Sequence, residues 1–330
     1  MSWIIREMRV PEDYERVAEL LSTWQSDPVT VDRMKAEDAI IPVKGQLKQN
    51  ESNELCGYDR VRWVAVKEEN GEACGYAVVV RAGWDAPGDL FLTLVVHPGE
   101  TGQGVGQALY RTAEQWAENV GASLFKLSVR EEDQRAVAFA QKRGFKMSRR
   151  TFESKLDVAE YNGPSWVDRR HALEEEGILF CSLQELPGEE EERKLYALCQ
   201  QTQPDIPGFS GKPPMYEWWR KWTLEADGAA PELVLLACHG ERIVGMVQLL
   251  WNKSSLSMYH EYSCVDREYR GRGIALALKL MAIEKAREWK AVYLRTHNDS
   301  MNGPMLHINR DVLGFQAEPG FYWMEKNLRP

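Results

Sequence analysis

The sequence predicts an α/β (α+β) protein made of two tandem copies of one domain, and three observations support this prediction. The chain has 330 residues, about twice the usual size of a domain. Short strand-like apolar runs alternate with stretches that have helical periodicity. The order of these elements occurs twice along the chain, which is the signature of an internal repeat.

The two copies keep a constant spacing. Val96 and Val265 each end a strand-like run and lie 169 residues apart, as do Gly104 and Gly273 in the loops that follow. The Gly-Phe pairs that close the copies lie 170 residues apart, so the second copy has gained one residue before its end. We therefore expect each copy to contain the same elements.

The elements follow the same order in each copy. A short strand leads through a proline to an acid-rich helix start. Two strands joined by a tight glycine turn come next. A third strand then runs into a glycine-rich loop and a helix. A further strand, a short helix ending in Gly-Phe and a last strand complete the copy. The strand-like segments are 3–8, 62–80, 90–96 and 123–129 in the first copy and 178–183, 232–250, 258–265 and 291–296 in the second.

The domain boundaries follow from this repeat. We expect an N-terminal domain over residues 1–156 and a C-terminal domain over residues 177–330. The polar segment 157–176 contains Asn-Gly-Pro and is interpreted as a linker.

Composition excludes several classes of protein. The formal net charge is -9 and neither half is basic, so no nucleic-acid partner is expected. The six cysteines form no CxxC pair, which predicts reduced thiols and no metal site. The sequence has no run of about 18 apolar residues, so no membrane span is predicted. The first residues do not resemble a signal peptide. We expect a cytoplasmic protein that is a monomer or a homodimer and has no membrane partner.

The segment "DREYRGRGIALAL" predicts an anion site. Unpaired backbone N–H groups and a partial positive charge mark the first turn of a helix. Gly271 and Gly273 let the backbone approach a ligand closely. Arg270 and Arg272 add positive charge. The segment is therefore suited to bind phosphate.

The motif is neither of two common phosphate-binding patterns. The dinucleotide fingerprint G-x-G-x-x-G and the Walker pattern are both absent. The pattern [RQ]-x-x-G-x-[GA] fits Arg270, Gly273 and Ala275. In the first copy Gly104 and Gly106 fit, but a threonine replaces the arginine.

This pattern, placed between a strand and a helix and followed by Gly-Phe, resembles the GNAT superfamily of N-acetyltransferases over nearly all of both halves. "YRGRGIALALK", "THNDSMNGPMLHIN" and "LGF" resemble tandem (two-domain) GNAT proteins, a group that includes mycothiol synthase. The resemblance implies two GNAT domains, each a mixed, mostly antiparallel central sheet flanked by helices. It also implies acetyl-CoA (coenzyme A) as donor and acetyl transfer to a primary amine of a small molecule by direct attack.

The resemblance also implies which residues bind coenzyme A. In that family the loop amides hold the pyrophosphate, splayed fourth and fifth strands admit the pantetheine arm, and the amide that ends the fourth strand polarises the thioester. The implied residues of the second copy are Cys264, Val265, Arg270, Gly271, Arg272, Gly273, Ile274, Ala275, Asn298 and Asn302. For Asn298 and Asn302, turn formation and helix capping are alternative roles.

The matching residues of the first copy are Val96, Gly102, Gly104, Val105 and Gly106. This copy keeps the glycines but lacks the arginine charge. It is therefore either a weaker site or a decayed one. Its strand "LFLTLVV" has no carboxylate, so we expect it to be non-catalytic.

The catalytic base is expected on the fourth strand, "MYHEYSCV". Alternation places Tyr259, Glu261 and Ser263 on one face and His260 and Tyr262 on the other. Glu261 is the one carboxylate in this strand, and partial burial would raise the pKa of its carboxyl to a value that suits a general base. An ion pair with a neighbouring arginine is the alternative. The commonest family position for the base is that of Tyr259, whereas His260 is interpreted as structural.

The family's usual general acid is a tyrosine four residues before the closing glycine. Ala140 stands there in the first copy. In the second copy the position is Arg310, or Asn309 if the extra residue is bulged out. Asn309 would then hydrogen-bond the thiol, or the thiolate would leave unaided or through water. The missing tyrosine also supports an alternative function, a non-enzymatic acyl-CoA-binding or regulatory protein.

The segment 203–222, "QPDIPGFSGKPPMYEWWRKW", lies where the family's variable substrate-binding segment lies. Its aromatic residues are interpreted either as a wall over the acceptor amine, with Asp205 attracting the amine's charge, or as a core-packed helix.

Overall fold

The two repeats share one core order of elements, to which the first adds a short strand and the second adds a helix before its first strand. The computed structural model describes residues 2–24, 28–40, 45–209 and 211–328. The chain divides into two units: unit 1 is Met1–Val129, Asp133–Ser148 and Trp323–Pro330, and unit 2 is Arg130–Glu132 and Arg149–Tyr322.

In the first repeat the strands are β1 (Trp3–Glu7), β2 (Gln46–Gln49), β3 (Leu55–Lys67), β4 (Ala73–Arg81), β5 (Asp89–Val96), β6 (Leu124–Arg130) and β7 (Lys146–Asp157). The helices are α1 (Tyr14–Ser22), α2 (Val31–Ile40), α3 (Val105–Asn119) and α4 (Gln134–Gln141). In unit 1 the strand order is β1-β3-β4-β5-β6, antiparallel except for the parallel pair β5 and β6.

In the second repeat the strands are β8 (Ile178–Ser182), β9 (Val234–His239), β10 (Arg242–Asn252), β11 (Ser257–Val265), β12 (Tyr293–Asp299) and β13 (Gln316–Asn327). The helices are α5 (Trp166–Glu175), α6 (Glu189–Thr202), α7 (Tyr216–Thr223), α8 (Ile274–Glu288) and α9 (Gly303–Leu306). The strand order β7-β12-β11-β10-β9-β8 is again antiparallel except for one pair, β11 and β12. The mixed, mostly antiparallel sheets flanked by helices confirm the predicted fold class.

The last strand of the first repeat belongs to the sheet of unit 2. Residues 151–157 of β7 pair antiparallel with all of β12, and the end of β13 belongs to unit 1. The compact units therefore do not coincide with the sequence repeats 1–156 and 177–330. The segment 157–176 contains helix α5, which packs through the buried Leu173.

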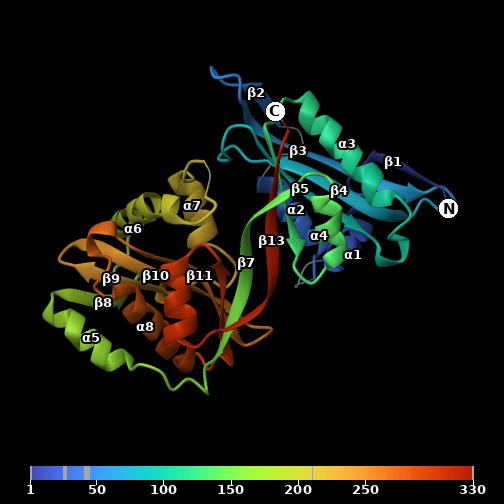
Figure 1. Ribbon diagram of the computed structural model, residues 1–330. Coiled ribbons are helices and arrows are strands. Elements are labelled where there is room, and N and C mark those ends of the chain that lie inside the picture. Colours follow the sequence, from blue (N-terminus) through green and yellow to red (C-terminus); the bar gives the residue numbers. More distant parts are fainter. Residues whose placement is uncertain (1, 25–27, 41–44, 210, 329–330) are drawn as a thin grey trace. The chain divides into compact units, whose positions relative to one another are not determined.

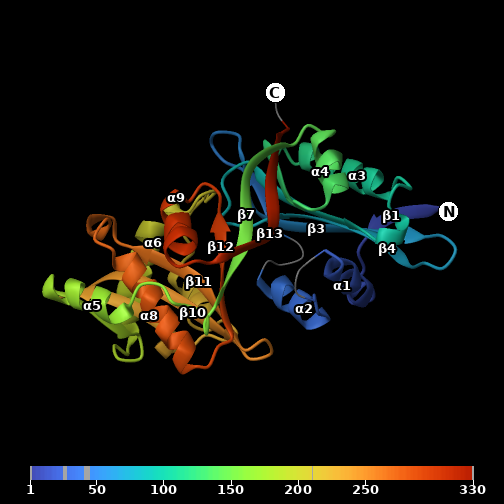
Figure 2. The same cartoon turned by 60° about the horizontal axis from the view of Figure 1, so that its bottom comes forward.

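Helices cover both faces of each sheet (Figures 1 and 2). In unit 2, α6 and α7 bury one apolar cluster, and α5 and α8 bury another on the opposite face. In unit 1, α1 and α2 lie on one face and α3 on the other. No helix among the described residues has the length and apolarity that a membrane crossing needs.

A glycine on the sheet lets the first turn of α8 lie directly on β10. A Cβ atom placed at Gly245 would lie 3.0 Å from Cδ1 of Leu278 and 3.1 Å from Cγ2 of Ile274. Gly75 has the same role beneath Val105 and Leu109 of α3. This close contact fixes the start of each helix at the edge of the candidate site.

Candidate functional site

The glycine-rich loop of unit 2 leads into helix α8, whose N-terminus has no side-chain cap. Gly271 and Gly273 have φ of 78° and 88°, values that glycine adopts without strain. Ile274 begins α8, and Gly273 at its N-cap offers no side-chain acceptor. Within the described part of the chain, the N–H groups of 271–274 donate no hydrogen bond. These donors are available to an anion.

The first repeat has the same backbone without the charge. Gly102 and Gly104 have φ of 84° and 87°, and Val105 begins α3 without a side-chain cap. Thr101 and Gln103 stand where the second repeat has Arg270 and Arg272. The backbone shape is thus shared, whereas the positive charge belongs to unit 2.

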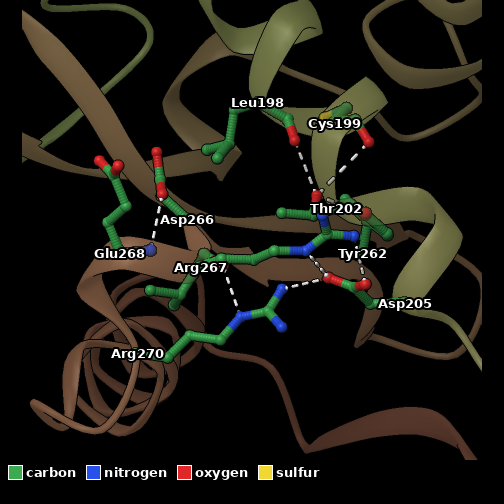
Figure 3. A network of polar contacts seen from close by, with 10 residues as sticks. Leu198, Cys199, Thr202, Asp205, Tyr262, Asp266, Arg267, Glu268 and Arg270 are labelled. Carbon is green, nitrogen blue, oxygen red and sulfur yellow. Dashed lines mark hydrogen bonds and ion pairs between the residues drawn. The ribbon is translucent and has the colours of Figure 1, made fainter.

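An ion-pair network holds the arginines beside the loop (Figure 3). Arg270 donates through Nε to the carbonyl of Val265 at 3.0 Å and through Nη2 to Asp205 at 2.6 Å. Arg267 also donates to Asp205, at 2.5 and 3.0 Å. Hydrogen bonds from Arg267 and then Arg270 lower the pKa of Asp205 to about 2. The expectation that Asp205 attracts the acceptor amine is therefore wrong, because arginines of this chain already neutralise it.

Arg272 lies over the ring of Tyr269, with its guanidinium carbon 5.1 Å from the ring centre. Ala275 follows in the first turn of α8 and is half-buried, and Ile274 is buried in the core. The predicted loop residues of the second repeat are thus brought together at one helix start.

Strands β11 and β12 separate next to this helix start. They pair in parallel from Ser257 to His260, and no pairing is described beyond. Asp266 donates its N–H to Val244, so Val265 occupies the alternate, non-hydrogen-bonded position opposite Gly245. The N–H of Val265 therefore points away from β10, toward the opening between the strands. β5 and β6 likewise pair from Asp89 to Leu92, short of Val96.

A β-bulge places Glu261 outside the regular alternation. Gln248 pairs with Tyr262, but its neighbour Leu249 pairs with His260, so Glu261 has no partner on β10. The extra residue on β11 reverses which face of the sheet each later residue of this strand occupies. The predicted faces are therefore wrong: Tyr262 lies on the face of Tyr259, and Ser263 on that of His260. In the first repeat β5 runs beside β4 without a bulge.

Glu261 is exposed, and desolvation by the surrounding protein raises the pKa of its carboxyl. It forms no ion pair with the described residues, so the alternative of an arginine partner is not what the structure shows. Tyr259 shares a 2.7 Å hydrogen bond with Nδ1 of His297. Burial, followed by the charge of Glu261, raises the pKa of Tyr259. Tyr259 and Glu261 are thus close enough to influence each other.

A π-helical turn over residues 307–312 accommodates the extra residue of the second repeat. The backbone N–H of Phe315 donates to the backbone carbonyl of Asn309 at 2.9 Å, as the N–H of Phe145 does to the carbonyl of Ala140 at 3.2 Å. Asn309 is therefore the residue equivalent to Ala140, and Arg310 is exposed. Asn309 is buried, and its Oδ1 has no partner among the described residues.

A chain of buried polar side chains leads to Asn309. Asn309 donates to Asn298 at 2.8 Å, and Asn298 donates to Ser154 at 2.9 Å. Ser154 lies on β7, the last strand of the first repeat, which pairs with β12 of the second. Ser154 is not among the site residues predicted from the sequence. Asn302, in contrast, caps α9 by accepting from the N–H of Met305, which is one of the two alternative roles considered for it from the sequence.

The remaining predicted residues have structural contacts. Cys264 is buried against α6, in the cluster that contains Cys199. A Cβ atom at Gly106 would lie 3.3 Å from Val96, so α3 packs tightly against the end of β5. All six cysteines are free thiols. Among the described residues, no three His, Cys, Asp or Glu side chains are placed to hold a metal ion.

The aromatic segment forms helix α7, of which Trp219 alone is buried. Trp219 packs in the core with Tyr196 and Tyr216. Trp218 and Trp222 form a half-buried ring pair with centres 5.6 Å apart. One side of the helix is therefore core, and the other side carries the half-buried pair of Trp218 and Trp222.

The site residues together suit acyl transfer from an anionic donor. The loop amides and arginines form an anion cradle, the parted strands expose a backbone N–H at Val265, and the bulge presents the Glu261 carboxylate. These groups bind charge, polarise a carbonyl and accept a proton, respectively.

Comparison with known proteins agrees with this chemistry. Residues 21–145 and 195–308 each match the model of the family described as "Acetyltransferase (GNAT) family". No curated protein matches the sequence significantly. The fold is similar to that of a GCN5-related N-acetyltransferase from Sphaerobacter thermophilus, with 21% identity, a TM-score of 0.69, and coverage of 99% of this chain and 96% of the other.

A tandem GNAT protein from the clavulanic acid biosynthesis pathway also has this fold. Its identity is 16% and its TM-score is 0.69, over 100% of this chain and 99% of the other. A glucosamine N-acetyltransferase region of a fungal multi-domain protein gives a TM-score of 0.71 at 17% identity, over 98% of this chain and 38% of that chain. At these identities the likeness concerns the fold.

Proposed function

Since the chain belongs to the acetyltransferase (GNAT) family, as a member with two tandem domains, we propose that it is an N-acetyltransferase whose second repeat moves an acetyl group from acetyl-CoA to a primary amine of a small molecule. The observation that carries this proposal is the coincidence, in one repeat, of the charged loop, the open N–H of Val265 and the bulged Glu261. The first repeat has the loop backbone, but it lacks the arginines and the bulge, and it has Leu92 where the second repeat has Glu261. We propose that it is non-catalytic.

The residues present fit coenzyme A. The cradle formed by Gly271, Gly273 and the first turn of α8 would hold the pyrophosphate, with Arg270 and Arg272 adding charge. Space is open at Gly271, where an added Cβ atom would meet nothing within 4 Å. The parted strands β11 and β12 would admit the pantetheine arm. When bound, acetyl-CoA supplies the acetyl thioester.

Each catalytic group has a defined task. Glu261 accepts the proton that the amine loses as it attacks, and its raised pKa favours this transfer near neutral pH. The N–H of Val265 donates to the carbonyl oxygen as negative charge develops there. Tyr259 stands beside Glu261 and lines the acceptor side of the strand.

Asn309 is suited to hold the thiol rather than to protonate it. Its Nδ2 already donates to Asn298, and the free atom is Oδ1, an acceptor. We propose that Oδ1 accepts a hydrogen bond from the product thiol, and that water supplies the proton. The acceptor is proposed to be a cationic amine, because the chain is acidic overall.

The test is an acceptor-amine screen that monitors free thiol release. We expect Glu261→Gln to lose turnover while binding acetyl-CoA normally, and the double variant Arg270→Ala/Arg272→Ala to lose acetyl-CoA binding. Gln103→Ala, at the first-repeat position equivalent to Arg272, is the matched control. Full turnover of Glu261→Gln across pH 6–9 would exclude Glu261 as the base. Tight binding without turnover for any amine would favour a non-enzymatic acyl-CoA-binding protein.

A further inference from the structure

Arg169, on helix α5, lies against the glycine-rich loop of unit 2. A Cβ atom placed at Gly273 would be 1.9 Å from Nη2 and 2.7 Å from Cζ of this arginine. The guanidinium therefore rests on the backbone where α8 begins. Arg169 belongs to the segment 157–176, outside both stretches that match the family model.

The position is unfavourable for a cation in the protein alone. The N-terminal end of α8 carries partial positive charge, and a guanidinium placed there is repelled. Nε of Arg169 is buried, and it has no hydrogen-bond partner among the described residues. The side chain forms no ion pair with any of them either. An anion at the helix start would satisfy both the guanidinium and the free amides.

Apolar contacts of α5 hold Arg169 in this place. Trp166 packs edge-on against Phe180, with ring centres 5.0 Å apart. Leu173 is 2% exposed and lies in the core beneath α8. Residues 166, 169 and 173 share one face of a helix. The packing that anchors the helix therefore also directs Arg169 toward the loop.

Among the described residues, the first repeat has no cation at the equivalent position. The nearest side chain to the equivalent position, Gly104, is Trp3, whose Cζ2 would lie 3.8 Å from an added Cβ atom. An indole at this place offers no charge to a phosphate. The difference follows the same division between the repeats as Arg270 and Arg272.

We propose that Arg169 is a further coenzyme A-binding residue, which reaches from α5 to donate to the pyrophosphate held at the start of α8. The inference rests on the proposed function, since it requires coenzyme A to bind this loop. Its guanidinium donates two or more charge-assisted hydrogen bonds to phosphate oxygens.

The experiment is calorimetric titration of the full chain with coenzyme A. Arg169→Gln should weaken binding about 10- to 100-fold, the range for a charged hydrogen bond. Arg169→Lys, which keeps the charge but not the fork, should lose less. The matched control is Arg170→Gln, which removes the same charge from a neighbouring exposed side chain paired with Glu174. Thermal unfolding without ligand verifies that each variant is folded.

The outcomes separate the inference from the function on which it rests. Equal affinities of the Arg169→Gln and Arg170→Gln variants, in a chain that binds coenzyme A, would overturn the inference alone, as would tighter binding by Arg169→Gln. No binding by the unaltered chain would overturn both. Dephospho-coenzyme A, which lacks the 3′-phosphate, should show the same loss with Arg169→Gln. A loss confined to coenzyme A would overturn the pyrophosphate assignment.

Discussion

Lys279, in the second turn of α8, is buried with 1% of its surface exposed. Desolvation lowers the pKa of its ammonium group to about 7, from an ordinary value of 10.5. Nearby His260 is also buried, and neither of its ring nitrogens has a partner among the described residues. Burial and the charge of Lys279 lower the pKa of this histidine. We predict that Lys279→Met stabilises the protein at neutral pH.

The sign and size follow from the lowered pKa of Lys279. Below pH 7 both the folded and the unfolded states are protonated, so folding bears the full cost of burying the charge. Between pH 7 and 10.5 the folded state has released the proton, and this cost declines as the pH rises. The difference of 3.5 pH units corresponds to about 5 kcal/mol as an upper limit, at 1.36 kcal/mol per unit.

The assay is the difference in Tm between the Lys279→Met variant and the unaltered chain from pH 6 to pH 10. We expect the variant to be more stable than the unaltered chain at pH 6–7 and to lose this advantage steadily above pH 7. Lys285→Met, which removes a lysine paired with Glu288 on the same helix, is the control and should show no comparable trend. An advantage that is independent of pH, or a less stable variant at pH 7, would show that the ammonium group of Lys279 does not destabilise the fold.

Three further predictions concern the loop and its surroundings. Gly245→Val should displace the first turn of α8, because even a Cβ atom lies 3.1 Å from Ile274; we expect a loss of about 1–3 kcal/mol and weaker coenzyme A binding, measured by denaturation and calorimetry. Asp205→Asn should remove the part of the acid destabilisation that occurs as pH falls from about 4 to 2, because the lowered pKa of Asp205 stabilises the fold above that range; an unchanged acid limb of the Tm curve would contradict this. Gly104→Val strains the loop of the first repeat, and we expect coenzyme A affinity to stay within about twofold; a larger loss would give this loop a role in binding.

The sequence predicted the loop because its chemistry is local. Gly271 and Gly273 encode a backbone with positive φ, and the strand before them and the helix after them show clear periodicity. The spacing between the repeats also limited the acid position to Arg310 or Asn309. The π-helical turn then identified Asn309, since the hydrogen bond to Phe315 matches that to Phe145.

Other features depend on tertiary structure and left no local signal. The bulge at Glu261 contains no glycine or proline, so simple alternation assigned Tyr262 and Ser263 to the wrong faces. The pairing of β7 with β12 joins residues of different repeats, which no single segment encodes. Arg169 stands in a polar segment that was interpreted as a linker. This segment has too few apolar positions for the sequence to indicate a packed helix.

In the proposed function, the second repeat alone binds the acyl donor and performs the chemistry. The most direct measurement is the stoichiometry of acetyl-CoA binding by calorimetry, for the unaltered chain and for the Arg270→Ala/Arg272→Ala variant. We expect one acetyl-CoA per chain and no binding by the variant. Two equivalents per chain, or one equivalent that survives both substitutions, would contradict it.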